Sequence, residues 1–193
     1  MMQPAQKGIT PPGTLAFSKG LYSNKEKYAN DKYVGTLLLD KGIEANDAFA
    51  KERLSRHKQA GGDPKHSPAK DGDKAKGQDG KAKEWAKGKW VVKFKTKDPV
   101  VVRDAKKNKI DSAVLRVAGG DLVRFAWGEN IQTKEGQWNG VALYLNGVQL
   151  LEKRAADADF DEYEGGFDVN EYAGADEGAG KEKEKEEGDD FDF

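Results

Sequence analysis

The chain has 193 residues, a length that favours one domain with appendages over two domains. Charged residues make up 35% of it and apolar residues 36%, which indicates that part of the chain does not fold. Cysteine is absent, so disulfides and thiolate metal ligands or nucleophiles are excluded. No secretory leader and no apolar run of membrane-spanning length is visible, and we expect a soluble intracellular protein with no membrane partner.

The net charge of −1 hides a division of the chain into two oppositely charged parts. Residues 1–154 contain 30 Lys and Arg against 18 Asp and Glu, a net charge of +12. Residues 155–193 contain three Lys against 16 acids, a net charge of −13. A basic body joined to an acidic tail predicts a polyanionic partner and a tail that takes part in interactions.

The first half of the chain predicts one helix between irregular segments. Residues 1–13 are rich in Pro and Gly and indicate a flexible arm, and residues 14–40 read as short strands and turns. The segment 43–62 predicts a helix with a partial apolar stripe of Ile43, Phe49 and Leu54, and Gly61 ends it. Residues 61–89 have few aliphatic residues and many Gly, Asp and Lys, which predicts a flexible basic insertion.

From residue 90 the sequence alternates strictly between apolar and polar residues, as half-buried strands do. Three strands are predicted to place apolar residues on one face: Trp90, Val92 and Phe94; Val123, Phe125 and Trp127; and Val141, Leu143 and Leu145. Between the first two, residues 99–111 predict a strand that runs into a basic turn. The pattern predicts a mainly β fold, a small barrel with one helix over residues 14–154, followed by a disordered acidic tail over residues 155–193.

Signatures of an enzyme are weak. His57 and His66 are the only histidines, and neither has a nearby Ser and Asp in the arrangement of a catalytic triad. The acidic segment 157–168 resembles a calcium loop, but Glu162 stands where the turn needs Gly and Asp168 where the loop needs Glu. We therefore expect no catalytic residue, no metal site and no cofactor.

Basic strand faces that alternate with aromatic residues are the stronger signal, because single-stranded nucleic acid needs cations for its phosphates and rings for its bases. The candidate cations are Lys93, Lys95, Lys97, Arg103, Lys106, Lys107, Lys109 and Arg124. The candidate rings are Trp138, Tyr144, Tyr22, Tyr28 and Tyr33. For each lysine the alternative is an ordinary solvated strand face, and the aromatic residues that alternate with valines are expected in the core.

Two stretches carry a resemblance to a known family. Residues 100–153 and the closing "GDDFDF" resemble the single-stranded DNA-binding proteins of podovirus-type tailed bacteriophages, and residues 13–35 resemble them more loosely. The Lys-rich insertion departs from that pattern. The resemblance implies an OB-fold barrel, DNA binding without sequence preference, roles in replication, recombination and repair in the cytoplasm of an infected bacterium, and a homodimer. It also implies that the tail contacts the phage DNA polymerase and primase-helicase.

The end of the tail places large apolar rings among acids, which suits capture by a partner better than burial in its own domain. The predicted partner-binding residues are Asp189, Asp190, Phe191, Asp192 and Phe193. We expect the tail to compete with DNA for the cationic surface and to bind partners when DNA displaces it. The alternatives are an RNA-binding or RNA-chaperone barrel, a protein-interaction adaptor and, more weakly, an enzyme that acts on DNA ends.

Overall fold

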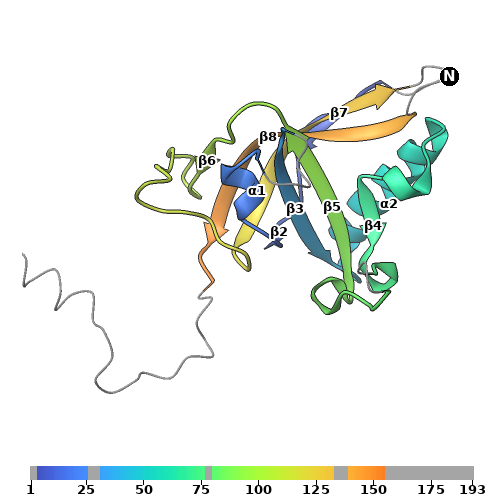
Figure 1. Ribbon diagram of the computed structural model, residues 1–193, viewed down its shortest axis with the longest axis horizontal. Coiled ribbons are helices and arrows are strands. Elements are labelled where there is room, and N and C mark those ends of the chain that lie inside the picture. The colour runs from blue at the N-terminus through green and yellow to red at the C-terminus, as the bar shows by residue number, and fades with distance from the viewer. Residues whose placement is uncertain (1–3, 26–30, 77–79, 133–138, 155–193) are drawn as a thin grey trace, which may run out of the picture. The chain divides into compact units, whose positions relative to one another are not determined.

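The computed structural model describes residues 4–25, 31–76, 80–132 and 139–154. The strands are β1 Lys7–Ile9, β2 Gly13–Leu15, β3 Tyr33–Asp40, β4 Ala69–Asp71, β5 Lys89–Thr96, β6 Val102–Arg103, β7 Leu122–Gln132 and β8 Gly140–Glu152. The helices are α1 Lys19–Tyr22 and α2 Glu44–Gln59, and the 3₁₀ turns are η1 Pro64–His66, η2 Gly72–Lys74 and η3 Glu84–Ala86. The predicted helix is confirmed as α2, and α1 is an additional short one (Figure 1).

Five strands close into a barrel. Around the ring, β2 pairs with β3, β3 with β5, β5 with β8, β8 with β7, and β7 with β2 again. The ring is closed by a parallel pair in which Lys95 of β5 lies opposite Tyr144 of β8. The remaining pairs of the ring are antiparallel. The predicted mainly β, OB-type barrel is therefore confirmed.

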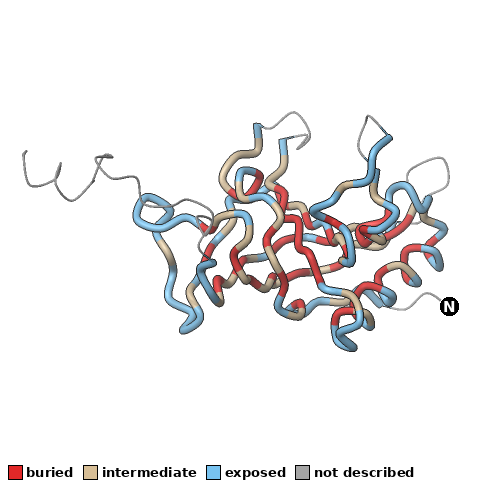
Figure 2. The backbone as a smooth tube through the Cα atoms, turned by 90° about the horizontal axis from the view of Figure 1, so that it is seen from below, coloured by how far each residue is buried: buried red, intermediate tan, exposed pale blue. Residues whose placement is uncertain are grey.

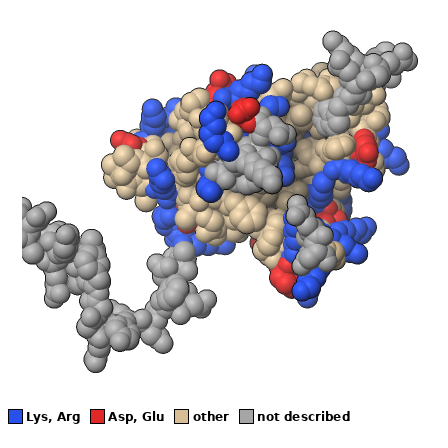
Figure 3. Space-filling model, in the orientation of Figure 1, with Lys and Arg blue, Asp and Glu red and all other residues tan. Residues whose placement is uncertain are grey.

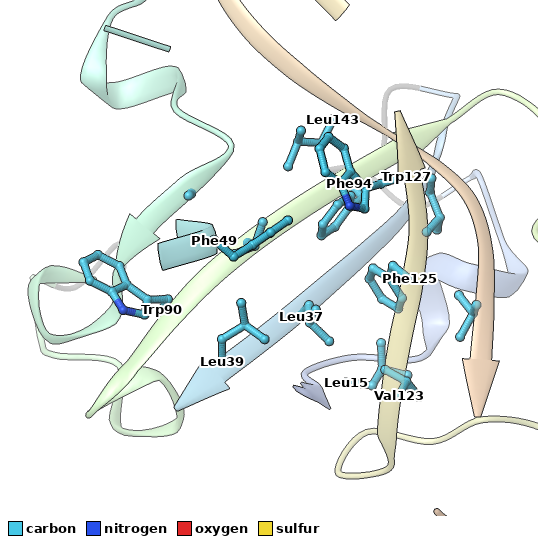
Figure 4. Close-up of a cluster of buried hydrophobic side chains, with 14 of the residues drawn as sticks. Leu15, Leu37, Leu39, Phe49, Trp90, Phe94, Val123, Phe125, Trp127 and Leu143 are labelled. Carbon is cyan, nitrogen blue, oxygen red and sulfur yellow. The ribbon is translucent and has the colours of Figure 1, made fainter. Parts of the chain in front are cut away.

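The core lies inside the barrel, where the predicted inward residues meet (Figure 4). Phe94 and Phe125 are both fully buried and contact edge to face, with ring centroids 5.1 Å apart. Gly35 makes room for this contact, because a Cβ there would lie 2.8 Å from the Phe125 ring. Figure 2 shows the buried residues gathered in the inner stretches of the chain, while the outlying loops are mostly exposed. The alternation read from the sequence therefore gives the correct inner face for β5, β7 and β8.

Helix α2 packs against the barrel through charged side chains as much as apolar ones. Its buried residues are Asn46, Phe49, Ala50, Arg53, Arg56 and His57. Ile43, which we expected in an apolar stripe, is 52% exposed and precedes the helix. The stripe is too narrow to cover the barrel, so arginines complete the buried face.

Glu129 of β7 compensates the buried charge of the helix. Arg56 donates to both oxygens of the Glu129 carboxylate, with its Nε 3.0 Å from each, and to the carbonyl of Pro4. Arg53 is 1% exposed, lies 4.6 Å from the Trp127 ring and places one nitrogen 3.6 Å from Glu129. The backbone N–H of Glu129 donates to the carbonyl of Gln6 at 2.8 Å. Helix, strand and N-terminal segment therefore share one buried charge cluster.

Two segments that we expected to be irregular pair with the barrel. Within the predicted N-terminal arm, β1 pairs with β7. Within the predicted insertion, β4 pairs with β5, and the N–H of Lys93 donates to the carbonyl of Pro68. Strand pairing is made by backbone groups, which every residue type carries except the proline N–H. The low aliphatic content of residues 61–89 therefore gave no sign of the pairing of β4 with β5.

His57 fastens α2 to the start of β8. Its ring accepts a hydrogen bond from the Val141 N–H at 3.0 Å and lies 2.9 Å from the carbonyl oxygen of Asp63. Gly62 and Gly140 leave space for the ring, because a Cβ on either would come within 2.5 Å of it. The ring thus occupies a fitted position between three parts of the chain.

The buried charge cluster gives a test of the fold. Replacing Glu129 with Gln should lower the free energy of unfolding by about 3–5 kcal/mol, because Arg56 and Arg53 would stay buried without their shared counter-charge. Urea unfolding followed by circular dichroism measures this change.

The matched control is Lys51→Ala, which removes an exposed ion pair with Asp47 within the same helix. That change should cost no more than about 0.5 kcal/mol. A loss for Glu129→Gln as small as that of the control would contradict the role given to the cluster.

Candidate nucleic-acid interface

The outer face of β5 carries lysines because its inner face is packed in the core. Val92 and Phe94 are fully buried, and alternation turns Lys93 and Lys95 to the outside. Lys93 is exposed and Lys95 is half-buried. Pairing with β3 sets Lys93 opposite Thr36. Two neighbouring cations therefore stand on one sheet face.

Three further lysines approach this pair from other segments. Although the Lys93 side chain is exposed, nearby protein atoms displace part of its hydration and lower its pKa below the ordinary value. The positive charges of Lys95, Lys70 and Lys83 lower this pKa further. Partial burial also lowers the pKa of Lys95, with a contribution from Lys32. A lowered lysine pKa means that the surroundings disfavour the charged form of the side chain. We call Lys32, Lys70, Lys83, Lys93 and Lys95 the lysine cluster.

No carboxylate neutralises this cluster within the part of the chain that the structure describes. The ion pairs there use other cations: Lys25, Lys41, Lys51, Arg53, Arg56, Lys89 and Lys153. Figure 3 shows Lys and Arg side chains spread over one face of the molecule, with Asp and Glu at a few separate places. The lysine cluster is therefore a site of positive charge open to an external anion.

A pair of exposed aromatic rings adjoins the lysine cluster. Phe17, just after β2, and Trp85, in η3, contact edge to face with centroids 5.1 Å apart. They are 50% and 38% exposed. The Lys83 ammonium lies 5.5 Å from the centre of the Trp85 ring, and Lys83 belongs to the cluster. We call Phe17 and Trp85 the ring pair.

Tyr144 places another ring next to the lysines. It lies opposite Lys95 in the parallel pair of β5 and β8 and is 43% exposed. Its hydroxyl accepts a hydrogen bond from Asn130 at 3.2 Å. Lys97 follows the end of β5 and is exposed, and Tyr33 begins β3 and is half-buried. Of the sequence-predicted residues, Lys93, Lys95 and Tyr144 are thus brought together.

Four of the other predicted cations form a second group at the end of β6 and in the turn that follows it. Arg103, Lys106, Lys107 and Lys109 are all exposed there. Arg103 donates to the carbonyl of Lys107, and Arg124 donates to Gln149, which donates in turn to the carbonyl of Asp104. Strand β6 pairs with β8 at Val148 and Gln149, four to five residues beyond Tyr144. At the rise of a strand the two groups are roughly 15 Å apart along β8.

Several predicted residues lie outside the described part of the chain. They are Tyr28, Trp138 and the tail residues Asp189, Asp190, Phe191, Asp192 and Phe193. Tyr22, a further candidate ring, accepts a hydrogen bond from the Val117 N–H at 2.7 Å and supports that loop. It therefore has a structural role.

The ring pair was missed by reasoning from the sequence. Phe17 and Trp85 are 68 positions apart and belong to segments that have no strand periodicity of their own. The available signal was Trp85 itself, a large ring in a Lys-rich stretch that has no Leu, Ile or Val beside it. A ring with no local apolar partner must either pack at a distance or stay exposed, and Trp85 does both.

The described residues contain no group of three or more His, Asp or Glu side chains placed to hold a metal ion. They also include no helix that is long and apolar enough to cross a membrane.

Sequence comparison identifies no relative: no protein-family model matches the chain, and no curated protein matches it significantly. Solved structures do match. The single-stranded DNA-binding protein of bacteriophage Enc34 in complex with single-stranded DNA has a TM-score of 0.57 and 18% identity, over 76% of this chain and 86% of that one. A C-terminal truncation of the Enc34 protein matches with a TM-score of 0.56 and 18% identity over the same shares.

The single-stranded DNA-binding protein gp2.5 of bacteriophage T7 matches with a TM-score of 0.51 and 20% identity, over 84% of this chain and 99% of that one. These identities are low, so the likeness is one of fold. The chain therefore has the fold of phage single-stranded DNA-binding proteins, as the resemblance in its sequence implied.

Proposed function

We propose that the chain is a non-enzymatic protein that binds single-stranded DNA without sequence preference, with the lysine cluster and the neighbouring exposed rings as its binding surface. The observation that carries the proposal is the set of five lysines that no described carboxylate pairs, next to exposed aromatic side chains on one sheet face. Cations that follow the phosphates and rings that stack on bases are what such binding requires.

The fold comparison supports this assignment. The Enc34 protein that shares the fold was solved in complex with single-stranded DNA. The basic turn at residues 103–109 extends the cationic surface along β8, so a strand can contact both groups. We infer that the protein coats transient single strands during phage DNA replication, recombination and repair, in the cytoplasm of the infected bacterium.

The tail completes the proposal. Its charge of −13 nearly balances the +12 of the body, so it can compete with DNA for the cationic surface. Released by DNA, it would bind the phage DNA polymerase and primase-helicase through the ring of Phe193, with Asp189, Asp190, Phe191 and Asp192 around it. A homodimer belongs to the same proposal, and sedimentation equilibrium tests it: a monomer at binding concentrations would exclude it.

The two lysines of β5 test the electrostatic part of the surface. The double variant Lys93→Ala, Lys95→Ala should bind all single-stranded sequences more weakly and flatten the slope of log K against log salt by about 1.4, because each phosphate contact contributes about 0.7. Fluorescence anisotropy titrations at several salt concentrations give this slope.

Lys58→Ala, an exposed lysine of α2, is the control and should leave the slope unchanged. The proposal fails if the double variant keeps the wild-type slope, or if the wild type binds duplex more tightly than single strands. A preference for RNA over DNA in competition would support the RNA-binding alternative.

The depressed pKa values of Lys93 and Lys95 predict a pH effect on binding. In the free protein the pKa values of both ammonium groups lie below the ordinary lysine value of 10.5. A bound phosphate favours the charged form and raises these pKa values again. Affinity should therefore fall as pH rises through these lowered pKa values, at a pH below the ordinary lysine value of 10.5.

The variant Lys93→Arg, Lys95→Arg keeps both charges throughout this range, since arginine does not deprotonate in proteins. Its affinity should change less between neutral pH and about pH 10 than that of the wild type. If the DNA affinities of the two proteins change equally with pH, deprotonation of these lysines does not control binding, and the prediction is wrong.

Removal of the tail tests its competition with DNA. The chain without residues 155–193 should bind single strands more tightly, most clearly at about 0.01 M salt, where the Debye length is about 30 Å. The difference should shrink towards 1 M salt because screening removes the attraction between tail and body. Anisotropy titrations of both proteins measure it.

Deletion of Phe193 alone is the matched control, since it keeps every acidic side chain and should leave DNA affinity unchanged. The same variant should bind the phage polymerase about ten-fold more weakly, or worse, if the terminal ring is the anchor. Equal DNA affinity of the full and tail-less chains at low salt would exclude competition.

A further inference from the structure

We propose that the ring pair, Phe17 and Trp85, is a subsite for an unpaired nucleobase, and that the packing of residues 72–73 and 84–88 holds Trp85 in place for it. This inference rests on the proposed function and names the residues that distinguish single strands from duplex. Neither ring was among the residues predicted from the sequence.

The exposure of the two rings is the first observation. Among the described residues, two other pairs of aromatic rings are in contact: Phe94 with Phe125, and Phe49 with Trp127. Both rings of each pair lie in the core. The ring pair instead leaves half of Phe17 and more than a third of Trp85 open to solvent. Exposed apolar rings in mutual contact keep free π surface that a flat ligand can cover.

The second observation is that the segment carrying Trp85 is firmly built. Ala86, its neighbour in η3, is fully buried, and a Cβ on Gly72 would lie 2.0 Å from the carbonyl oxygen of Ala86. Asp73 accepts from the Gly88 N–H at 2.6 Å and also pairs with Lys41. The indole therefore projects from a close-packed base, and little freedom is lost when a ligand stacks on it.

The pair also lies where a strand of DNA would pass. The N–H of Ala16, next to Phe17, donates to the carbonyl of Thr36, and Thr36 is opposite Lys93 on the outer sheet face. Lys83 contacts the Trp85 ring and contributes to the lowered pKa of Lys93. A nucleotide with its phosphate on the lysine cluster thus has its base within reach of the rings.

Stacking supplies a discrimination that the lysines cannot. Phosphates are present in single and double strands alike, so cations bind both. A base inside a duplex has both faces covered by its neighbours, whereas an unpaired base can offer one to a side chain. The ring pair would therefore raise affinity for single strands of any sequence.

The test compares oligo-dT with an abasic strand of the same length, using the full chain. The variants are Trp85→Ala and Phe17→Ala, with Val114→Ala, which removes an 84% exposed side chain in another loop, as the control. Each ring variant should lose about 5- to 150-fold in affinity for oligo-dT, the effect of one stacked base, and almost none for the abasic strand. Trp85→Phe should restore most of the affinity.

The outcomes separate the two proposals. A wild type that fails to bind oligo-dT overturns the proposed function. If the wild type binds oligo-dT, and the ring variants have the same affinities as Val114→Ala for both oligo-dT and the abasic strand, only the proposal for the ring pair is overturned. If a ring variant fails to fold, photo-cross-linking of the wild type to a bromodeoxyuridine strand decides. Adducts on the tryptic peptides 84–87 or 8–19 support the subsite, and adducts confined to other peptides overturn it.

Discussion

The two-sided character of β5 is the constraint on which the rest of the structure depends. Trp90, Val92 and Phe94 face the core, and Lys93 and Lys95 face outwards between them. A shift of one residue in the pairing with β3 would bury lysines and expose the aromatic rings, so burial on one side determines what the other side presents. Like charges repel one another on the outer face, and the burial of apolar side chains on the inner face offsets this repulsion.

That arrangement explains why the segment between α2 and β5 matters. It returns along the outside of β5, pairs through β4, and brings Lys70, Lys83 and Trp85 to the lysines of the strand. A barrel without this segment would keep Lys93, Lys95 and Tyr144 but would lack Lys70, Lys83 and Trp85 beside them. The part of the sequence that departs from the phage pattern therefore contributes to the same surface as the part that follows it.

Local periodicity predicted the fold where one strand face is buried, as in β5, β7 and β8. It also placed Lys93, Lys95 and Tyr144 on outer faces. It could not find the pairing of Phe17 with Trp85, because that contact depends on how distant segments return to the barrel. Nor could it find the buried face of α2, since Arg53 and Arg56 are acceptable in the interior only in the presence of Glu129, more than 70 positions later.

The cluster around Glu129 also sets an order of events during synthesis. The backbone contact between Gln6 and Glu129 and the ion pair between Arg56 and Glu129 cannot form until most of the domain has left the ribosome. Until then the N-terminal segment, the charged face of α2 and the ring of Phe49 lack their partners, and contacts of such long sequence separation form slowly. The nascent chain therefore exposes this apolar surface until late in its synthesis, and such exposure favours aggregation.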